Sequence, residues 1–170
     1  MSPSGSRRVV SNTSPLTNLV TIGQFTLLSE LFGELHIAEG VWSELNAKGH
    51  QWPGGSEVAA ASWVQQHLVH NQALVTALQR DLDRGEAETI ALALELEADL
   101  VLLDEREGRR AAQRLGIRVM GVVGVLLAAK ERGILDQIRP HLDALRHKAG
   151  FYLGESVYQS ALSLAGESDT

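Results

Sequence analysis

Short apolar segments alternate with amphipathic segments along most of the chain. Short runs of β-branched and aliphatic residues predict strands, whereas apolar residues spaced three or four apart predict helices. This alternation is typical of an α/β fold with a central, mostly parallel sheet and helices on both of its faces. The predicted strands are 9–10, 34–37, 64–69, 100–103 and 117–120, and the predicted helices are 16–22, 25–32, 38–48, 57–63, 74–82, 85–94, 107–115, 122–131, 134–147 and 155–165.

The first predicted strand, 9–10, ends at a run of small polar residues that includes Asn12, Thr13 and Ser14. Thr13 or Ser14 can cap the next helix, and Pro15 suits its first helical position. In open α/β sheets, however, the carboxyl ends of the strands are also where ligands bind. Two interpretations therefore stand at this point: a helix cap alone, or one wall of a binding site.

Acidic residues lie at the ends of further predicted elements. Asp104 follows a predicted strand, Glu86 opens a predicted helix, and Glu44 lies on another. Because parallel strands end at one edge of a sheet, we expect these carboxylates to meet Asn12 in one cleft. Two unpaired carboxylates about 4 Å apart repel by on the order of 4 kcal/mol at an effective dielectric constant near 20. A divalent cation that prefers oxygen ligands, Mg²⁺ or Mn²⁺, would relieve this repulsion and could activate water beside a phosphate.

The composition indicates one domain without a membrane segment. A chain of 170 residues with 44% apolar residues is long enough for one well-buried core and short for two, so we expect a single domain over residues 1–170. The absence of cysteine excludes disulfides and thiolate metal sites. No signal peptide and no run of about 20 apolar residues is evident, which predicts a cytoplasmic location. The net charge of −6 argues against a protein that coats nucleic acid, but not against an enzyme with one local site.

Five short segments, in their order and spacing, carry a family likeness. They are VVSNTSPL at 9–16, VWSEL at 41–45, GEAE at 85–88, LLDEREGRR at 102–110 and LGIRVMGVVGVL at 115–126. Together they resemble PIN-domain proteins, in particular the prokaryotic VapC-like toxins. The likeness covers about residues 8–150, which leaves 151–170 as a C-terminal helical extension of one PIN-like domain. It implies a three-layer α/β/α fold, metal-dependent cleavage of single-stranded RNA, a small antitoxin protein as partner, and a homodimer.

The resemblance also assigns the site residues. The acidic positions of the family correspond to Asn12, Glu44, Glu86 and Asp104, with Thr13 and Ser14 lining the same edge toward the substrate. Among them, Asp104, Glu86 and Glu44 are the implied ligands of Mg²⁺ or Mn²⁺, and Glu88 and Glu107 are the reserve candidates.

One departure from the family pattern leaves alternatives open. The family usually has Asp where this chain has Asn12, and an amide oxygen can coordinate a metal but brings no charge. A catalytically impaired PIN-like module that binds RNA or a partner protein is therefore a second interpretation. A regulatory domain that binds a nucleotide or phosphate is a third, although it leaves Glu44 and Glu86 unexplained.

The helix that follows Asp104 carries arginines with two interpretations. Arg106 and Arg109 are three residues apart, so both can face one way and hold RNA phosphates with their guanidinium groups. Alternatively, this is a solvated helix face on which arginines pair with Glu105 and Glu107.

Other conspicuous side chains are expected to be structural. The histidines lack a zinc-binding spacing, the tryptophans fit core or interface positions better than base stacking, and two glycines fit turns or close packing because the rest of a phosphate loop is missing. These residues are His36, His50, His67, His70, His141, His147, Trp42, Trp52, Trp63, Gly121 and Gly124.

Overall fold

The computed structural model describes residues 7–47 and 53–168, so His50 and Trp52 lie outside the described residues. Five strands form one sheet in the order β3-β2-β1-β4-β5, and every pairing between them is parallel. The strands are β1 (Val9–Ser11), β2 (Leu35–Ala38), β3 (Val64–His67), β4 (Leu100–Leu102) and β5 (Val119–Met120). The prediction of an α/β fold with a mostly parallel sheet is therefore confirmed.

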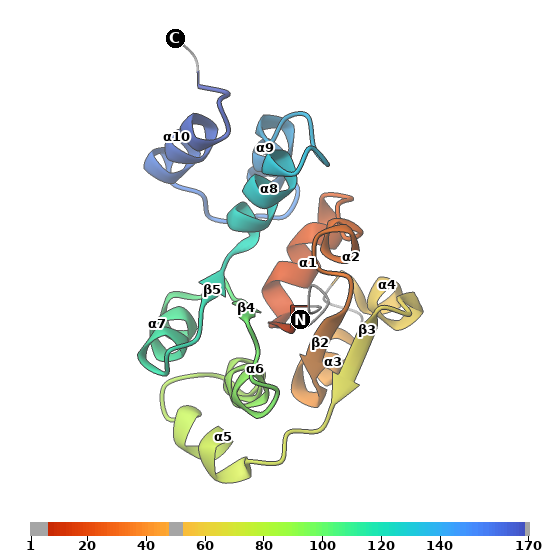
Figure 1. Ribbon diagram of the computed structural model, residues 1–170, viewed down its shortest axis with the longest axis vertical. Helices are drawn as coiled ribbons and strands as arrows, with labels where there is room; N and C mark the ends of the chain where they lie inside the picture. The colour runs from red at the N-terminus through yellow and green to blue at the C-terminus, as the bar shows by residue number, and fades with distance from the viewer. Residues whose placement is uncertain (1–6, 48–52, 169–170) are drawn as a thin grey trace, which may run out of the picture.

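Helices cover both faces of the sheet, which gives three α/β/α layers (Figure 1). The helices are α1 (Thr13–Thr21), α2 (Leu27–Phe32), α3 (Glu39–Leu45), α4 (Gly55–Ala60), α5 (Gln72–Leu78), α6 (Arg84–Glu95), α7 (Arg106–Arg114), α8 (Val122–Glu131), α9 (Arg139–His147) and α10 (Glu155–Leu164). In the view of Figure 1, α1, α2 and α8–α10 lie above the sheet, and α5–α7 lie below it.

Alternation along the strands divides the core into two clusters. Successive side chains of a strand point to opposite faces, so Val9 packs with α1, α2 and α8 whereas Val10 packs with α5 and α6. The same division holds on β4, where Leu102 belongs to the first cluster and Val101 to the second. The central strands β1 and β4 are buried on both faces, and β4 has the unbroken apolar sequence that is typical of a parallel sheet, whereas the edge strand β3 carries polar Gln65 and Gln66.

The strand order defines one crevice. From β1 the chain adds β2 and β3 on one side of the sheet, then crosses back and adds β4 and β5 on the other side. In open α/β sheets ligands bind outside the carboxyl ends of the strands where the order reverses, here between β1 and β4. The register pairs Ser11 with Leu102, and the Asn12 amide donates a hydrogen bond to the Leu102 carbonyl at 3.0 Å. Asn12 and Asp104 therefore leave the sheet beside each other.

The predicted capping of the first helix is wrong. Helix α1 begins at Thr13, so Asn12 is the N-cap residue, and its side chain makes no capping hydrogen bond. Thr13 and Ser14 lie within the first turn, and their hydroxyls donate to carboxylates, Glu44 Oε2 at 2.7 Å and Glu105 Oε1 at 3.2 Å. The two hydroxyls therefore bind carboxylates of other segments instead of capping the backbone of α1.

The predicted helix over 134–147 begins only at Arg139. Pro140 is the second residue of α9, and a proline farther inside a helix would remove a backbone hydrogen bond and clash with the preceding turn. Residues Tyr158, Ala161 and Leu162 of α10 are buried in the first core cluster. Within the part of the chain that the structure describes, the helices lack the length and apolar character needed to cross a bilayer.

Candidate functional site

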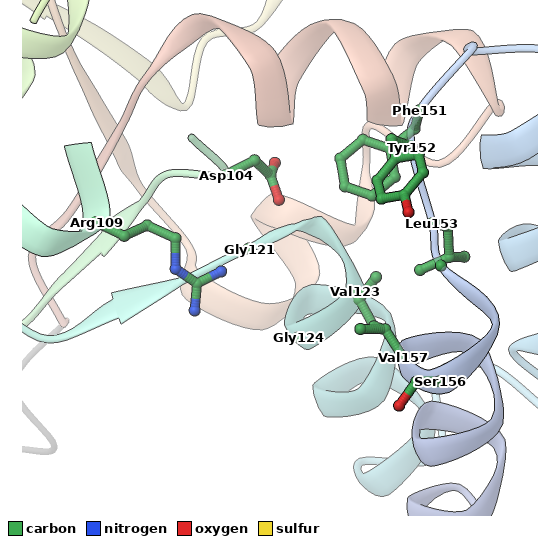
Figure 2. Close-up of a pocket in the computed structure, with 11 residues that line it drawn as sticks. Asp104, Arg109, Gly121, Val123, Gly124, Phe151, Tyr152, Leu153, Ser156 and Val157 are labelled. Atoms are coloured by element: carbon green, nitrogen blue, oxygen red, sulfur yellow. The ribbon is translucent and has the colours of Figure 1, made fainter. Parts of the chain in front are cut away.

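Asp104 lies in a cavity of about 540 Å³ beside the end of β4 (Figure 2). Its Oδ1 accepts a hydrogen bond of 2.9 Å from the backbone amide of Val122, at the start of α8. Gly121 permits this approach, because a Cβ at that position would lie 2.6 Å from Oδ1. Arg109 of α7 lines the same cavity. The cavity therefore combines one carboxylate with one guanidinium group.

Burial dominates the electrostatics of Asp104. It raises the pKa of the carboxyl to about 6, against the opposing influence of the Val122 amide and the Arg109 guanidinium, and Glu105 raises it further. Its second oxygen, Oδ2, is buried and has no hydrogen-bond partner within the described part of the chain. A buried charge without sufficient partners is costly, so binding of a cation or a proton would stabilise this carboxylate.

Asn12, Thr13 and Glu44 meet at the start of α6. Glu44 Oε2 accepts the Thr13 hydroxyl at 2.7 Å. A Cβ on Gly85 would lie 2.9 Å from Glu44 Oε2 and 3.5 Å from Asn12 Oδ1, so the absent side chain leaves room for both oxygens. Asn12 Oδ1 is itself buried and lacks a hydrogen-bond partner among the residues described. The side-chain oxygens of Glu44, on α3, and of Asn12, between β1 and α1, thus both lie beside the start of α6.

Glu86 lies in the first turn of α6 as predicted, and it takes part in a reciprocal cap. Asp83 Oδ1 accepts from the Glu86 amide at 2.8 Å, while Glu86 Oε1 accepts from the Asp83 amide at 3.3 Å. Burial is the main cause that raises the pKa of Glu86 to about 7, followed by neighbouring Asp83 and, more weakly, Glu105. Its other oxygen faces α7, where a Cβ on Gly108 would lie 2.8 Å away.

The reserve acids already have partners. Glu88 is buried, accepts from the Gly40 amide at 3.2 Å and forms an ion pair with Arg84. Glu107 is exposed on α7 and lies 3.8 Å from Arg110. Neither side chain is as free to take a further ligand as the unpaired oxygens of Asn12 and Asp104.

The two predicted phosphate-binding arginines have different environments. Arg109 is half-buried and lines the Asp104 cavity, whereas Arg106 is exposed at the start of α7. The helix-face alternative is realised at the neighbouring pair formed by Arg110 and Glu107.

Sequence reasoning missed two features of this site. The first is Asp83, although the order Asp83-Arg84-Gly85-Glu86 is a recognisable capping box. The second is a wall of the cavity formed by the C-terminal segment 151–157, which no local pattern connects to Asp104. Four glycines also leave room for a nearby carboxylate: Gly40 for Glu88, Gly85 for Glu44, Gly108 for Glu86, and Gly121 for Asp104.

The side-chain oxygens of the candidate site residues are of the kind that a hard divalent cation prefers, but they are not grouped closely enough to bind one together. No three His, Asp or Glu side chains in residues 7–47 and 53–168 are grouped closely enough to hold a metal ion. The two unpaired buried oxygens, Asn12 Oδ1 and Asp104 Oδ2, nevertheless belong to residues that follow the neighbouring strands β1 and β4. Carboxylate and amide oxygens suit Mg²⁺ or Mn²⁺ rather than a metal that selects sulfur. Glu44, Glu86 and Asp104 would have to turn toward each other to share one ion.

Comparison with known proteins places the whole arrangement in one family. A family model described as a PIN domain matches residues 8–167. The match runs from the start of β1 past the end of α10, so it includes every candidate site residue. No curated protein matches the chain significantly.

Proposed function

The chain belongs to the PIN-domain family, whose members are generally nucleases, and from that premise we propose that it is a metal-dependent endoribonuclease acting on single-stranded RNA. The observation that carries this proposal is the pair of unpaired buried oxygens, Asn12 Oδ1 and Asp104 Oδ2, at the strand-order reversal. A buried acceptor without a donor costs about 1–3 kcal/mol, so these two oxygens after neighbouring strands favour a bound cation.

In this proposal the chain's residues have distinct roles. Asp104, Glu86 and Glu44 hold Mg²⁺ or Mn²⁺, and Asn12 adds a neutral amide oxygen. Thr13 positions Glu44 through its 2.7 Å hydrogen bond, as Val122 positions Asp104 through its amide. When bound, the ion supplies charge neutralisation at the scissile phosphate and activation of water.

The substrate-binding roles fall to residues around the crevice. Arg109, inside the cavity, is placed to contact a phosphate with its guanidinium fork. Arg106, at the exposed start of α7, and Ser14, beside Glu105, are proposed to contact the strand farther along.

The deciding experiment compares Asp104→Asn with the unaltered protein on end-labelled single-stranded RNA in Mn²⁺. We expect cleavage to fall by at least roughly a hundredfold, because a metal contributes several kcal/mol of transition-state stabilisation. Asp81→Asn is the matched control, since Asp81 is exposed and has no part in the proposed site. Duplex RNA and single-stranded DNA complete the substrate set. Equal rates for Asp104→Asn and the unaltered protein would eliminate this proposal.

Asn12 supports a second candidate, a PIN-like module that binds RNA or a partner protein without cleaving it. A neutral side chain stands at a position where the family usually has an acid, and the remaining acids are separated. This candidate predicts RNA or protein binding with no cleavage in any divalent metal.

Toxicity, a protein antitoxin, a homodimer and a cytoplasmic location are further proposals, supported by the likeness to VapC-like toxins. We expect induced expression to arrest cell growth and the Asp104→Asn variant to relieve that arrest. Sedimentation of the purified chain measures the dimer directly. Growth arrest that persists with Asp104→Asn would dissociate toxicity from the proposed nuclease.

A further inference from the structure

We propose that Tyr152 is a stacking platform for a nucleobase of the single strand that enters the Asp104 cavity. The inference rests on the proposed function, since it assigns base recognition to the same cavity. Asp104 and Arg109 line one side of this cavity, and the segment Phe151–Val157 lines the other. Figure 2 shows the carboxylate of Asp104 directed into the space between them, with the rings of Phe151 and Tyr152 opposite.

The exposure of Tyr152 is unusual for an aromatic side chain. It is 91% exposed, more than any other exposed large hydrophobic residue in the described part of the chain. Val157, which is 52% exposed, lines the same cavity. Covering the face of the Tyr152 ring and the Val157 methyl groups would remove apolar surface from water, so their place at one cavity rim favours a ligand that covers them.

The backbone on both sides of Tyr152 is fixed. The Phe151 amide donates to the Leu145 carbonyl at 2.9 Å. The Leu153 side chain is buried, and its carbonyl accepts two hydrogen bonds from the Arg146 guanidinium, at 3.1 and 2.8 Å. Arg146 is held in turn by Tyr158, whose ring centroid lies 4.2 Å from its Cζ. Tyr152 is therefore presented to solvent from an anchored segment, which lowers the entropy cost of binding.

The chemistry of the two walls matches a nucleotide. A guanidinium suits the phosphate, and an aromatic face suits the base, since stacking on aromatic side chains is a general means of binding single strands. The cavity volume of about 540 Å³ lies within the ~300–1,000 Å³ of small-ligand sites. Arg109 is the only Lys or Arg among the described residues that line it, and the chain carries −6 overall. Attraction to the backbone is therefore weak, and stacking must supply much of the affinity.

The test measures equilibrium binding of fluorescein-labelled single-stranded RNA in EDTA, where metal-dependent cleavage is off. Tyr152→Ala should weaken binding roughly five- to a hundredfold, and Tyr152→Trp should retain it. Tyr152→Leu keeps an apolar side chain but has no aromatic face, so it should behave like the alanine variant. Leu164→Ala, at an exposed leucine outside this cavity, should leave the dissociation constant unchanged.

A second arm removes the base instead of the ring. Abasic residues are placed one at a time along the RNA, and one position should weaken binding to the unaltered protein by about the factor seen for Tyr152→Ala. The same abasic RNA should bind Tyr152→Ala no more weakly than intact RNA does, because ring and base act as one pair. The salt dependence should be shallow, since few phosphates are contacted.

The outcomes separate this inference from the proposed nuclease. If the protein cleaves RNA in Mn²⁺ but Tyr152→Ala binds it equally well, the platform is wrong and the nuclease stands. If cleavage is absent but binding depends on the Tyr152 ring, the platform stands and the nuclease is wrong. Retained affinity in Tyr152→Leu, no RNA binding by the unaltered protein, or a change in sedimentation of Tyr152→Ala without a change in RNA affinity would each overturn the platform.

Discussion

Asn12 is the proposed site residue that brings a neutral amide where the likeness to PIN domains leads us to expect a carboxylate. It is buried at the end of β1, and its amide oxygen has no hydrogen-bond partner among the described residues. A negative charge at this position would lie beside Glu44 as well as beside any bound cation. In the proposed function, the neutral amide of Asn12 therefore repels Glu44 less than a carboxylate would, and it also attracts the cation less strongly.

We expect Asn12→Asp to tighten Mn²⁺ binding by at least about tenfold, equivalent to about 1.4 kcal/mol. A unit charge about 4 Å from a divalent ion gains on the order of 8 kcal/mol at an effective dielectric near 20, most of which desolvation and carboxylate repulsion offset. Calorimetric titration with Mn²⁺ measures the change. Asn18→Asp, on helix α1 but outside the proposed site, is the control.

The result also separates the two candidate functions. Cleavage that emerges only in Asn12→Asp would identify the natural chain as an impaired binding module. Cleavage by both proteins would show that an amide oxygen suffices. Unchanged Mn²⁺ affinity would remove the basis for assigning Asn12 to the metal.

At this scale the sequence predicts where a residue lies in the fold better than what it contacts. Asp104 and Asn12 could be placed at strand ends because each follows a predicted strand. The register of β1 and β4 then brings the two strand ends beside each other. The Thr13 hydroxyl, by contrast, bonds to Glu44, 31 positions away, so no local pattern could distinguish this bond from a helix cap. Asp104 and Glu86 were predicted as metal ligands, and that assignment stays a prediction.

At the scale of elements, two helices that begin at the cavity offer a matched comparison. Gly121 is the N-cap residue of α8 and Gly154 is that of α10, and both line the Asp104 cavity. Neither has a positive φ, since the values are −92° and −65°. The two positions differ in their surroundings: a Cβ at 121 would lie 2.6 Å from Asp104 Oδ1, but one at 154 would meet only Tyr152, at 3.6 Å.

Gly121→Ala should therefore displace the Asp104 carboxylate from the Val122 amide, whereas Gly154→Ala should be tolerated. We expect RNA cleavage to fall roughly tenfold or more in the first variant, since small misplacements of catalytic groups are costly. Stability should fall by about 1 kcal/mol from the weakened hydrogen bond. Cleavage assays and denaturant unfolding measure the two effects. Equal behaviour of both alanine variants would contradict the steric argument.

The elements themselves were largely predictable because both faces of the sheet are buried. Strand β4 reads as a continuous apolar run, and α6 has small residues that pack closely on the sheet. The start of α9 was not predictable in the same way, because apolar Ile134, Leu135 and Ile138 suggest a helix that continues forward into 139–147. These residues instead form part of the connection that packs against the core.

At the scale of the whole molecule, the cavity depends on segments that are far apart in the sequence. The segment after β4 supplies Asp104, α7 supplies Arg109, and the connection before α10 supplies Tyr152. Long-range packing rather than local sequence brings them together, which is why the C-terminal wall escaped sequence reasoning. Whatever holds α10 in place therefore also shapes the cavity.

Glu167, just after α10, connects the C-terminal segment to α8 and α9. Its carboxylate accepts from the Ile138 amide at 2.8 Å, the Lys130 ammonium at 2.9 Å and the Arg139 amide at 3.2 Å. Ile138 is the N-cap residue of α9 and has no side-chain cap, so a carboxylate distant in sequence takes that place at the positive end of the helix. His141 also lies within electrostatic reach of this carboxylate.

Burial alone would raise the pKa of Glu167, but the Ile138 amide, the Lys130 ammonium and the Arg139 amide outweigh it and lower the pKa below the ordinary 4.5. In the pH range between the folded pKa and 4.5, the unfolded chain binds more protons than the native chain, so native stability rises with pH. The contribution of Glu167 is therefore present above about pH 4.5 and is lost as the pH falls through its folded pKa.

We expect Glu167→Gln to lower the free energy of unfolding at pH 7 by about 1–3 kcal/mol, the usual range for hydrogen bonds to a charged group. The variant should also lose less stability than the unaltered protein when the pH is lowered from 6 to 3. Denaturant titrations at several pH values measure both effects, and Ser168→Ala at the exposed neighbouring position is the control. Because α10 supports the segment that carries Tyr152, loss of the Glu167 hydrogen bonds to α9 should also weaken RNA binding by the same variant. If the free energies of unfolding of Glu167→Gln and the unaltered protein changed in parallel with pH, Glu167 would be excluded as the titrating group that links the C-terminal segment to α9.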